Sequence, residues 1–372
     1  MNGEGGPNPI RPVTAPGRAG LGGGGWGISF QMVQTASVLL LTLLLCVICG
    51  IFRTDSFLTG YNLVENLLVN AAFMGIIACG MTFVMIAGGF DLSVASTTVV
   101  CSIVAVLVLQ AFGGDPAVPG SEVPLTPWQV ALAIATAVIC AMVVGALLGA
   151  LNGTLIAYIG VNPFVVTLST MLIFRGLAFV ISDRGQSKRI PFAIQEVFAN
   201  FYWGDIVTFG SGRAEFSLLV PVVVFLVLFA VCFYVLRFTR FGHYTYAVGG
   251  NENAAWLAGV NTKLVKAATY VIVGLTSGIA ALIYCAQSST AQADTNQGLE
   301  FKVITCVIVG GTPLGGGAGS LLRTLNGLLL LAVIENMLMK FGVPEEYRKI
   351  VRGLIIVTVV AVDILVRKRS RS

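Results

Sequence analysis

Charged residues are scarce in this sequence. Only 10% of its 372 residues are Asp, Glu, Lys or Arg, whereas 56% are hydrophobic. An ordinary soluble domain carries about a quarter charged residues, so this composition excludes a soluble globular protein. The formal net charge of +5 comes from short basic clusters at the ends of apolar segments. Because that distribution leaves no basic surface, no nucleic-acid partner is expected.

Residues and motifs that most reactions require are also few. The single histidine, His243, cannot form a histidine pair, and no HExxH motif occurs. The phosphate-binding pattern GxxxxGK[ST] is absent, so this chain is not expected to bind ATP in that way. All eight cysteines lie inside apolar segments, where thiols behave as small hydrophobic side chains. The sequence therefore predicts a protein that is not an enzyme, with no catalytic residue, no metal site and no cofactor.

Long apolar segments are abundant instead. A helix of about 20 residues crosses a hydrocarbon core about 30 Å thick. The segments that meet or approach that length are roughly 32–52, 66–87, 93–112, 128–151, 163–182, 217–237, 267–287, 301–315, 320–340 and 350–366. The eighth is short and glycine-rich, so we expect a broken or re-entrant helix there, with nine spans as the alternative count. The predicted fold is an all-α, polytopic transmembrane bundle of about ten spans.

Basic residues predict how the bundle is oriented, because Lys and Arg are enriched on the cytoplasmic side. The long loop 238–266 and the C-terminal stretch 367–372 are both rich in them and are assigned to the cytoplasm. We expect residues 1–28, rich in Gly and Pro, to form a disordered cytoplasmic tail. Residues 29–366 are the expected transmembrane domain of the inner membrane, and 367–372 a basic cytoplasmic tail. Both chain ends are then inside.

A carboxylate stands at a glycine-rich break between two predicted spans. Asp91 follows Gly88 and Gly89 and precedes Ser93. An unpaired carboxylate in hydrocarbon costs about 3 kcal/mol on insertion scales, so Asp91 must be paired, capped or hydrated. The glycine pair permits a helix break, and Asp91 with Ser93 can cap the next span. A helix cap and a residue of a solute pathway are the two interpretations.

Further polar residues lie within or beside the spans. Arg175 falls inside the fifth span, where it should face the bundle or extend to the outer surface. Asn162 precedes that span and favours structural hydrogen bonding, while Glu300 is one of several groups expected to contribute a packing ion pair. The glycine run 310–319 is expected from close helix approach or a re-entrant turn.

Loop 238–266 carries the signals of a short helix. Asn251 can cap its first turn, Glu252 suits the positive helix end, and Gly259 can close its last turn. We expect this helix to present Ala254, Ala255 and Ala258 as a face of small residues. For Gly249 or Gly250, in the bend before it, we expect a backbone conformation with positive φ.

The same loop carries a family resemblance. RFGHYTYAVGGNENAAWLAGV resembles the cytoplasmic coupling loop of ribose- and xylose-type sugar permeases of ABC importers. Three other segments resemble that family in the expected order: GGFDLS, NPFVVTLSTMLIFRG and GLEFKVITCVIVGGTPLGGGAGS. The resemblance covers about residues 60–366. Two positions depart from the commoner pattern, where His243 replaces Arg and Phe301 replaces Leu.

The resemblance implies a permease subunit that forms the pathway for a monosaccharide such as ribose, xylose or galactose. It implies an ABC ATPase subunit, an extracytoplasmic sugar-binding protein and a second permease protomer, identical or different, as partners in the lipid bilayer. The implied coupling residues are Arg240, Gly242, Tyr244, Ala247, Gly249, Gly250, Asn251, Ala254, Ala255 and Gly259. The candidate residues of the pathway or helix break are Gly88, Gly89, Asp91, Ser93, Asn162, Phe164, Thr167, Arg175, Glu300, Gly310 and Gly311.

Two other functions remain open at this point. One is an ion-coupled secondary transporter that uses Asp91 or Glu335, although such a transporter has no need of the large cytoplasmic loop. The other is the same permease family carrying a nucleoside, a signalling furanone or a branched-chain amino acid.

Overall fold

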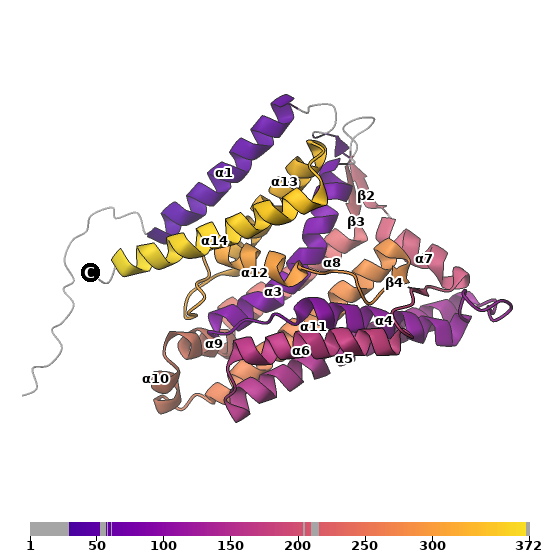
Figure 1. The fold of residues 1–372 in the computed structure, drawn as a ribbon, viewed down its shortest axis with the longest axis horizontal. Helices are drawn as coiled ribbons and strands as arrows, with labels where there is room; N and C mark the ends of the chain where they lie inside the picture. Colours follow the sequence, from indigo (N-terminus) through magenta and orange to yellow (C-terminus); the bar gives the residue numbers. More distant parts are fainter. Residues whose placement is uncertain are drawn as a thin grey trace, which may run out of the picture.

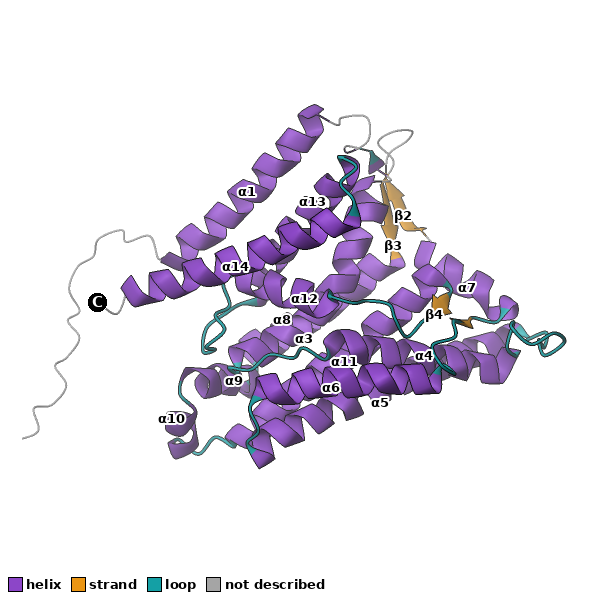
Figure 2. Cartoon of the chain, in the orientation of Figure 1, coloured by secondary structure: helices purple, strands orange, loops and turns teal. Residues whose placement is uncertain are grey.

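The computed structural model describes residues 30–52, 57, 59–60, 62–203, 205–209 and 216–369. Helices account for most of them, and the few strands lie at one end of the molecule (Figure 2). The elements in chain order are α1 (Phe30–Phe52), η1 (Asn62–Val69), α3 (Asn70–Ile86), α4 (Val94–Gly113), α5 (Pro127–Thr154), η2 (Leu155–Ile159), α6 (Pro163–Ile181), β1 (Lys188–Arg189), α7 (Phe192–Trp203), β2 (Asp205–Phe209), β3 (Phe216–Leu219), α8 (Val220–Phe238), α9 (Arg240–Gly250), α10 (Glu252–Leu257), α11 (Thr262–Ser288), β4 (Thr290–Ala291), α12 (Leu299–Val309), α13 (Leu321–Lys340) and α14 (Glu345–Arg369).

Strand pairing is limited to two antiparallel ribbons, β1 with β4 and β2 with β3. The π-helical turns η1 and η2 are continuous with α3 and α5, which lengthens those two helices. The fold is therefore an all-α bundle, as the apolar segments predict.

Seven helices in the described part of the chain are long and apolar enough to cross a membrane. They are η1 with α3, α4, α5 with η2, α6, α8, α11 and α13. This number confirms a polytopic membrane protein but does not reach the predicted ten. Helix α12, in the predicted eighth segment, has 11 residues. At 1.5 Å per residue it covers about half of a hydrocarbon core about 30 Å thick.

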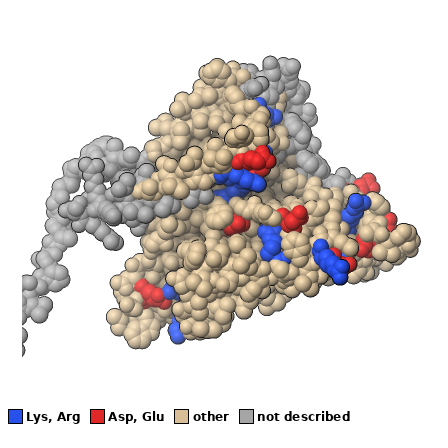
Figure 3. Space-filling model, viewed as in Figure 1, with Lys and Arg blue, Asp and Glu red and all other residues tan. Residues whose placement is uncertain are grey.

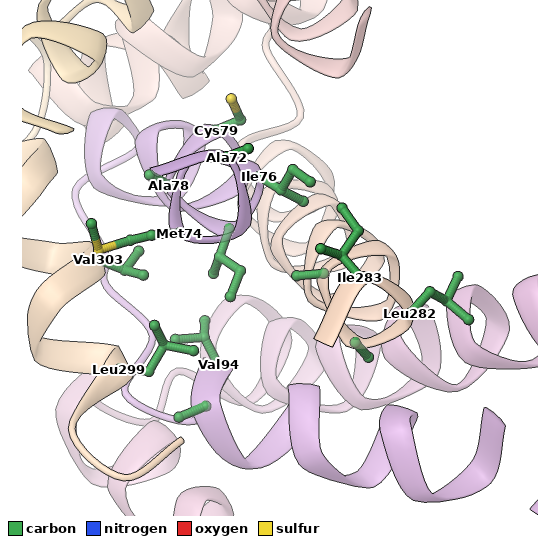
Figure 4. Packing of buried hydrophobic residues seen from close by; sticks show 14 of the residues in the cluster. Ala72, Met74, Ile76, Ala78, Cys79, Val94, Leu282, Ile283, Leu299 and Val303 are labelled. Carbon is green, nitrogen blue, oxygen red and sulfur yellow. The ribbon is translucent and has the colours of Figure 1, made fainter. Parts of the chain in front are cut away.

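Helix α3 lies at the centre of the bundle. In its most apolar window 83% of the residues are buried, compared with 28% for α5, α6 and α8. Side chains of α3, α4, α11 and α12 point toward one another around it, including Met74, Val94, Ile283 and Val303 (Figure 4). A helix that is apolar on all sides is expected at such a central position, and partly exposed apolar helices are expected to face lipid.

Small residues bring α5 and α11 into backbone contact. On α5 they recur at every fourth position: Ala133, Ala137, Ala141, Gly145, Gly149 and Gly153. A Cβ added at Gly145 would overlap the carbonyl oxygen of Gly274, and one added at Gly149 would overlap that of Tyr270. This small-residue spacing is the usual means by which membrane helices approach closely.

The two ends of the bundle differ in their elements (Figure 1). Helices α9 and α10 lie at one end, together with the last turns of α14, while α7 and the strands lie toward the other. Helix α7 buries Ile194 and Phe198, which lie four residues apart on one side of the helix. Charged atoms are few on the face in Figure 3, and basic and acidic groups there lie side by side over the start of α14.

Two predicted segments lie mostly outside the residues that the structure describes. The predicted N-terminal tail 1–28 lies outside the described residues, as do residues 370–372 of the predicted C-terminal tail. Helix α14 runs on to Arg369, so the described part of that tail is helical.

Candidate functional site

Helical structure is interrupted between α3 and α4 at the predicted glycines, and we call this interruption the break. Helix α3 ends at Ile86, α4 begins at Val94, and Gly88 between them has φ of 88°. Only glycine adopts that conformation readily, so the sequence fixes the break by steric rules alone.

Asp91 is buried in this break, with 2% of its surface exposed. Its Oδ1 accepts hydrogen bonds from the N–H of Ser93 at 2.7 Å and from the Ser93 hydroxyl at 2.6 Å. The side-chain amide of Asn152, on α5, donates to Asp91 Oδ2 at 3.4 Å and to Ser93 Oγ at 2.9 Å. Donors of this kind offset the cost of burying a carboxylate. Asp91 therefore closes a turn and ties the break to α5.

Of the two residues expected to cap α4, Ser93 does not do so with its side chain. Ser93 occupies the N-cap position of α4, but its side chain makes no capping hydrogen bond. Its hydroxyl donates to Asp91 and accepts from Asn152 instead. The Ser93 hydroxyl therefore belongs to a hydrogen-bond network with Asp91, two residues before it, and with Asn152 of α5.

Tyr270 of α11 also contacts the break. It is 2% exposed, and its hydroxyl donates to the carbonyl oxygen of Phe90 at 3.2 Å. A Cβ on Gly89 would lie 2.5 Å from that hydroxyl oxygen, so the second glycine of the pair leaves room for the tyrosine. Sequence analysis missed Tyr270, because nothing local marks a tyrosine that is 180 positions away.

Predicted pathway residues on α6 have mainly local partners. Asn162 caps the helix, since its Oδ1 accepts from the N–H of Phe164 at 2.9 Å. Thr167 is buried and its hydroxyl donates to the carbonyl of Pro163 at 2.8 Å. Phe164 approaches the break, with its ring centroid 6.3 Å from that of Phe90.

Arg175, further along α6, faces the bundle as predicted. Its guanidinium donates to the carbonyl oxygens of Ala293 and Thr295, both at 2.7 Å, and so holds the connection between α11 and α12. Glu300 lies in the first turn of α12 and is 6% exposed. Its Oε2 has no hydrogen-bond partner among the described residues. The predicted packing ion pair forms elsewhere on α12, as described below.

Helices α9 and α10 confirm the capping signals of loop 238–266. Asn251 Oδ1 accepts from the N–H of Ala254 at 2.9 Å, and Gly259, with φ of 83°, ends α10. Glu252 forms an ion pair with Lys266 of α11, which fastens α10 to the bundle.

One face of the α9–α10 segment is open to solvent. The predicted coupling residues Arg240, Tyr244 and Ala247 are exposed at helical spacing along α9. On α10, Trp256 and Leu257 are 66% and 78% exposed. Adjacent exposed large apolar residues of this kind indicate an interaction surface, and neither residue is among the coupling residues predicted above.

The predicted small-residue face of α10 needs correction. Ala254 and Ala258 are exposed, but Ala255 is 5% exposed and packs with Val248 and Val265. Because α10 folds back on α9 and α11, its one buried position falls at Ala255, and the exposed surface is the one that carries Trp256.

Backbones of three glycine segments meet beside the break. The N–H of Gly317 donates to the carbonyl oxygen of Ile86 at 2.8 Å. A Cβ on Gly249 would overlap that same oxygen, and one on Gly316 would lie 2.6 Å from the Cα of Gly88. We call the contact among Ile86, Gly88, Gly249, Gly316 and Gly317 the glycine junction. It joins the end of α3 to α9 and to the loop between α12 and α13.

Gly249 and Gly250 do not have the positive φ predicted for them. Both belong to α9, and neither is among the glycines of positive φ in the described chain. Gly249 is required by space, because α9 packs against the end of α3. Gly250 has no atom within 4 Å of an added Cβ. Gly242, also a predicted coupling residue, is a second close contact, against the carbonyl of Leu236.

Gly310 and Gly311 fit both reasons given for the glycine run. A Cβ on Gly310 would overlap the carbonyl oxygen of Arg323 in α13, and Gly311 turns the chain with φ of 91°. Helix α12 therefore ends in a turn and packs closely on α13.

Taken together, these contacts gather the predicted glycines of the break, of α9 and of the loop after α12 at one level of the bundle. The break, α9 and the loop 310–320 meet there, while Arg175 and Glu300 lie toward the opposite end. This arrangement can couple a movement of α9 to the end of a central helix.

Over residues 63–360 the sequence matches the family described as "Branched-chain amino acid transport system / permease component". The match covers well over half of the chain, and the chain belongs to this family of membrane permease components.

The names of individual relatives specify a transported solute. The chain is 36% identical to the Ribose import permease protein RbsC of Bacillus subtilis, over 89% of this chain and 92% of that protein. It is 32% identical to the Ribose import permease protein RbsC of Escherichia coli K12, over 89% and 94%. It is 33% identical to the L-arabinose transport system permease protein AraH of the same strain, over 88% and 90%. No solved structure is significantly similar to the chain.

Proposed function

We propose that this protein is the permease subunit of an ABC importer and carries a monosaccharide across the inner membrane. Similarity to ribose and arabinose permeases over 88–89% of this chain supports a sugar as the solute, and the seven apolar helices support a transmembrane pathway. The observation that carries the mechanism is the glycine junction, because it joins an exposed helix pair to the break in the central helix.

Energy for transport comes from a separate ATPase subunit in this proposal. The exposed face of α9 and α10, with Trp256 and Leu257, is its docking surface. An amphipathic helix that presents such anchors typically fits a groove of its partner. An extracytoplasmic binding protein delivers the sugar at the opposite end, and a second permease protomer completes the pathway.

The junction gives a route for the mechanical signal. Helix α9 contacts the carbonyl of Ile86 with no side chain between them, so a displacement of α9 acts directly on the end of α3. The same carbonyl holds Gly317, so the loop that follows α12 must move with it or release the hydrogen bond. Switching elements of this kind use a few residues at element ends as hinges.

The proposed topology has ten membrane segments with both chain ends in the cytoplasm. Helices α1 and α14 are the first and last segments, and α12 with the glycine turn after it is a short, broken span. Such a broken segment is tolerated in lipid only where the backbone is covered by protein, as Gly310 is by α13. Residues 1–28 and 367–372 are the proposed cytoplasmic tails, and α9–α10 lies on their side.

An ion-coupled transporter is the weaker candidate. Such a mechanism needs a carboxylate that can exchange its ion. Asp91 already accepts three hydrogen bonds, and Glu335 is paired with Lys302 and Arg352. Neither carboxylate is free to exchange an ion without first losing these partners.

Uptake in membrane vesicles tests the proposal. Vesicles that contain the permease with its ATPase and binding protein should accumulate a radiolabelled pentose or hexose when ATP is supplied. Uptake should persist after ionophores collapse the ion gradients. Uptake by the permease alone, driven by a proton or sodium gradient, would instead support the ion-coupled mechanism.

A further inference from the structure

A polar cavity of about 340 Å³ lies in the half of the bundle away from α9 and α10. It is bounded by the first turns of α3, the last turns of α11 and α13, and the start of α12. Its volume falls within the range of about 300–1,000 Å³ that small-molecule sites occupy. None of the predicted site residues lines it.

Side-chain amides dominate the polar lining. Asn66 and Asn70 stand one helical turn apart on η1 and α3, and Asn62 precedes them by another turn. Asn62 exchanges two hydrogen bonds of 3.0 Å with Asn336 of α13, which fixes the amide row against the opposite wall. Asn70 donates to the carbonyl of Asn66 at 2.8 Å, and its exposed side chain keeps an acceptor oxygen for a ligand.

The opposite side adds donors without partners. Asn296 lines the cavity, and its buried Nδ2 has no hydrogen-bond partner among the described residues. Gln287, at the end of α11, exposes its side chain to the same space. A buried amide donor left unpaired costs about 1–3 kcal/mol, so a rotation of Asn296 that lets Nδ2 donate to a ligand hydroxyl would be stabilising.

Charged lining residues neutralise one another. Lys302 pairs with Glu335 at 3.1 Å, and Arg348 pairs with Glu345 at 2.6 Å. Arg352, behind the lining, bridges Glu335 and Glu345 at 2.8 and 2.7 Å. A zwitterion such as an amino acid needs one unpaired cation and one unpaired anion, and this network offers neither.

Two aromatic rings supply an apolar wall. Phe73 and Tyr284 line the cavity with their ring centroids 6.2 Å apart and their planes tilted by 39°. An aromatic ring has a negative electrostatic potential on its face and a positive one at its edge. Its face therefore suits the C–H groups that one side of a sugar ring presents.

From these observations we propose that this cavity is the entry site for an uncharged polyhydroxyl solute of monosaccharide size. Amides of α3, α11 and the α11–α12 connection would bind its hydroxyl groups, and Phe73 with Tyr284 would cover its apolar side. The proposal rests on the proposed function and assigns the substrate contacts within it. It also separates this chain from carriers of amino acids, whatever its family is called.

Saturation-transfer NMR on the purified permease–ATPase complex, without binding protein, tests the site. The probes are D-ribose, D-xylose, L-arabinose, D-galactose and L-leucine, each at millimolar concentration. At least one sugar should give a saturable signal that L-leucine does not give. A double variant, Asn70→Leu with Gln287→Leu, should weaken the apparent affinity for that sugar about tenfold or more through loss of two hydrogen bonds.

Gln195→Leu is the matched control, because this glutamine lies on α7 and does not line the cavity. It should bind sugar as the wild type does. If the double variant yields no folded complex, the two single variants replace it, each with about a fivefold loss. Wild-type affinity in folded variants, or leucine binding as strong as that of the best sugar, would overturn the assignment.

The uptake experiment above keeps the two proposals apart. ATP-driven sugar uptake that is unaffected by the cavity variants would leave the importer intact and remove the site. Failure of ATP-driven uptake in the wild-type system would count against the importer itself.

Discussion

Glycine serves two different purposes in two regions of this protein. Between α5 and α11, Gly145 and Gly149 lie inside regular helices and let two straight backbones touch over several turns. At the glycine junction, the corresponding residues lie at helix ends and in a loop. Gly88, Gly316 and Gly317 there have φ between 74° and 88°.

The difference concerns what holds each contact in place. The α5–α11 contact is fixed by shape along the length of both helices, which gives it little freedom to move. A single backbone hydrogen bond of 2.8 Å, from Gly317 to Ile86, crosses the junction. We therefore expect the first region to behave as scaffold and the second as the moving part.

Gly145→Leu should have the largest effect on stability, because it disrupts the contact between α5 and α11. Its side chain would be forced into the backbone of α11 at Gly274. We expect a loss of about 3 kcal/mol or more from overpacking, seen as low yield and early thermal unfolding in detergent. Gly176→Ala is the control: this glycine, on α6, has no atom within 4 Å of an added Cβ. A stable Gly145→Leu protein would contradict the scaffold assignment.

Gly249→Ala should break the moving part while leaving the fold intact. One methyl group would press α9 away from the carbonyl of Ile86. We expect normal yield and melting but ATP-driven uptake reduced about tenfold or more, since a shift of only 1.4 kcal/mol corresponds to a factor of ten. Gly250→Ala should transport normally, because its site is open. Equal transport by the two variants would argue against the junction as the link.

Trp256→Ala tests whether the exposed surface of α10 binds the ATPase and so transmits its movement to the junction. Anchors of this kind are worth about 2 kcal/mol or more when they dock, which would weaken ATPase binding about thirtyfold. Trp128→Ala is a close match, because Trp128 is also 66% exposed but begins α5 at the other end of the bundle. Pull-down of the ATPase by each variant measures the effect, and equal binding by both would exclude Trp256 from the docking surface.

Asn152→Ala should have the smallest effect. This residue belongs to α5 yet donates to Asp91 and Ser93 in the break, so it connects scaffold and moving part. Loss of its hydrogen bonds should lower stability by about 1–2 kcal/mol, a shift of a few degrees in melting temperature. Asn253→Ala, at an exposed position of α10, should leave the melting temperature unchanged. An unchanged melting temperature for Asn152→Ala would show that the bridge does not stabilise the fold.

Local chemistry explains which parts of this structure could be predicted from the sequence. The cap at Asn251, the turn at Gly259 and the break at Gly88 depend on neighbouring residues, and all three were predicted. The repeat of small residues on α5 has the same local character, and a search for period four would have found it.

Other features depend on contacts between distant segments. The contact of Asp91 with Asn152 comes from α5, and Gly249 needs to be glycine because of where α3 ends. Burial of Ala255 reflects the packing of α10 on α9 and α11, which no helical wheel for α10 alone can reveal. The amide row at Asn66 and Asn70 is visible in the sequence, but its pairing across to Asn336 is not.

Main-chain atoms alone form the contact among Ile86, Gly249 and Gly317, and this has a consequence for chimeric transporters. Because no side chain of α9 or α10 takes part in it, the segment 240–257 can be exchanged for that of a relative that keeps an aromatic residue at position 241, where Phe241 stacks on Phe83 of α3. Such an exchange should redirect the permease to a different ATPase as long as the donor has glycine at position 249. A donor with alanine there would bring a suitable docking face, but its helix α9 could no longer pack against the end of α3.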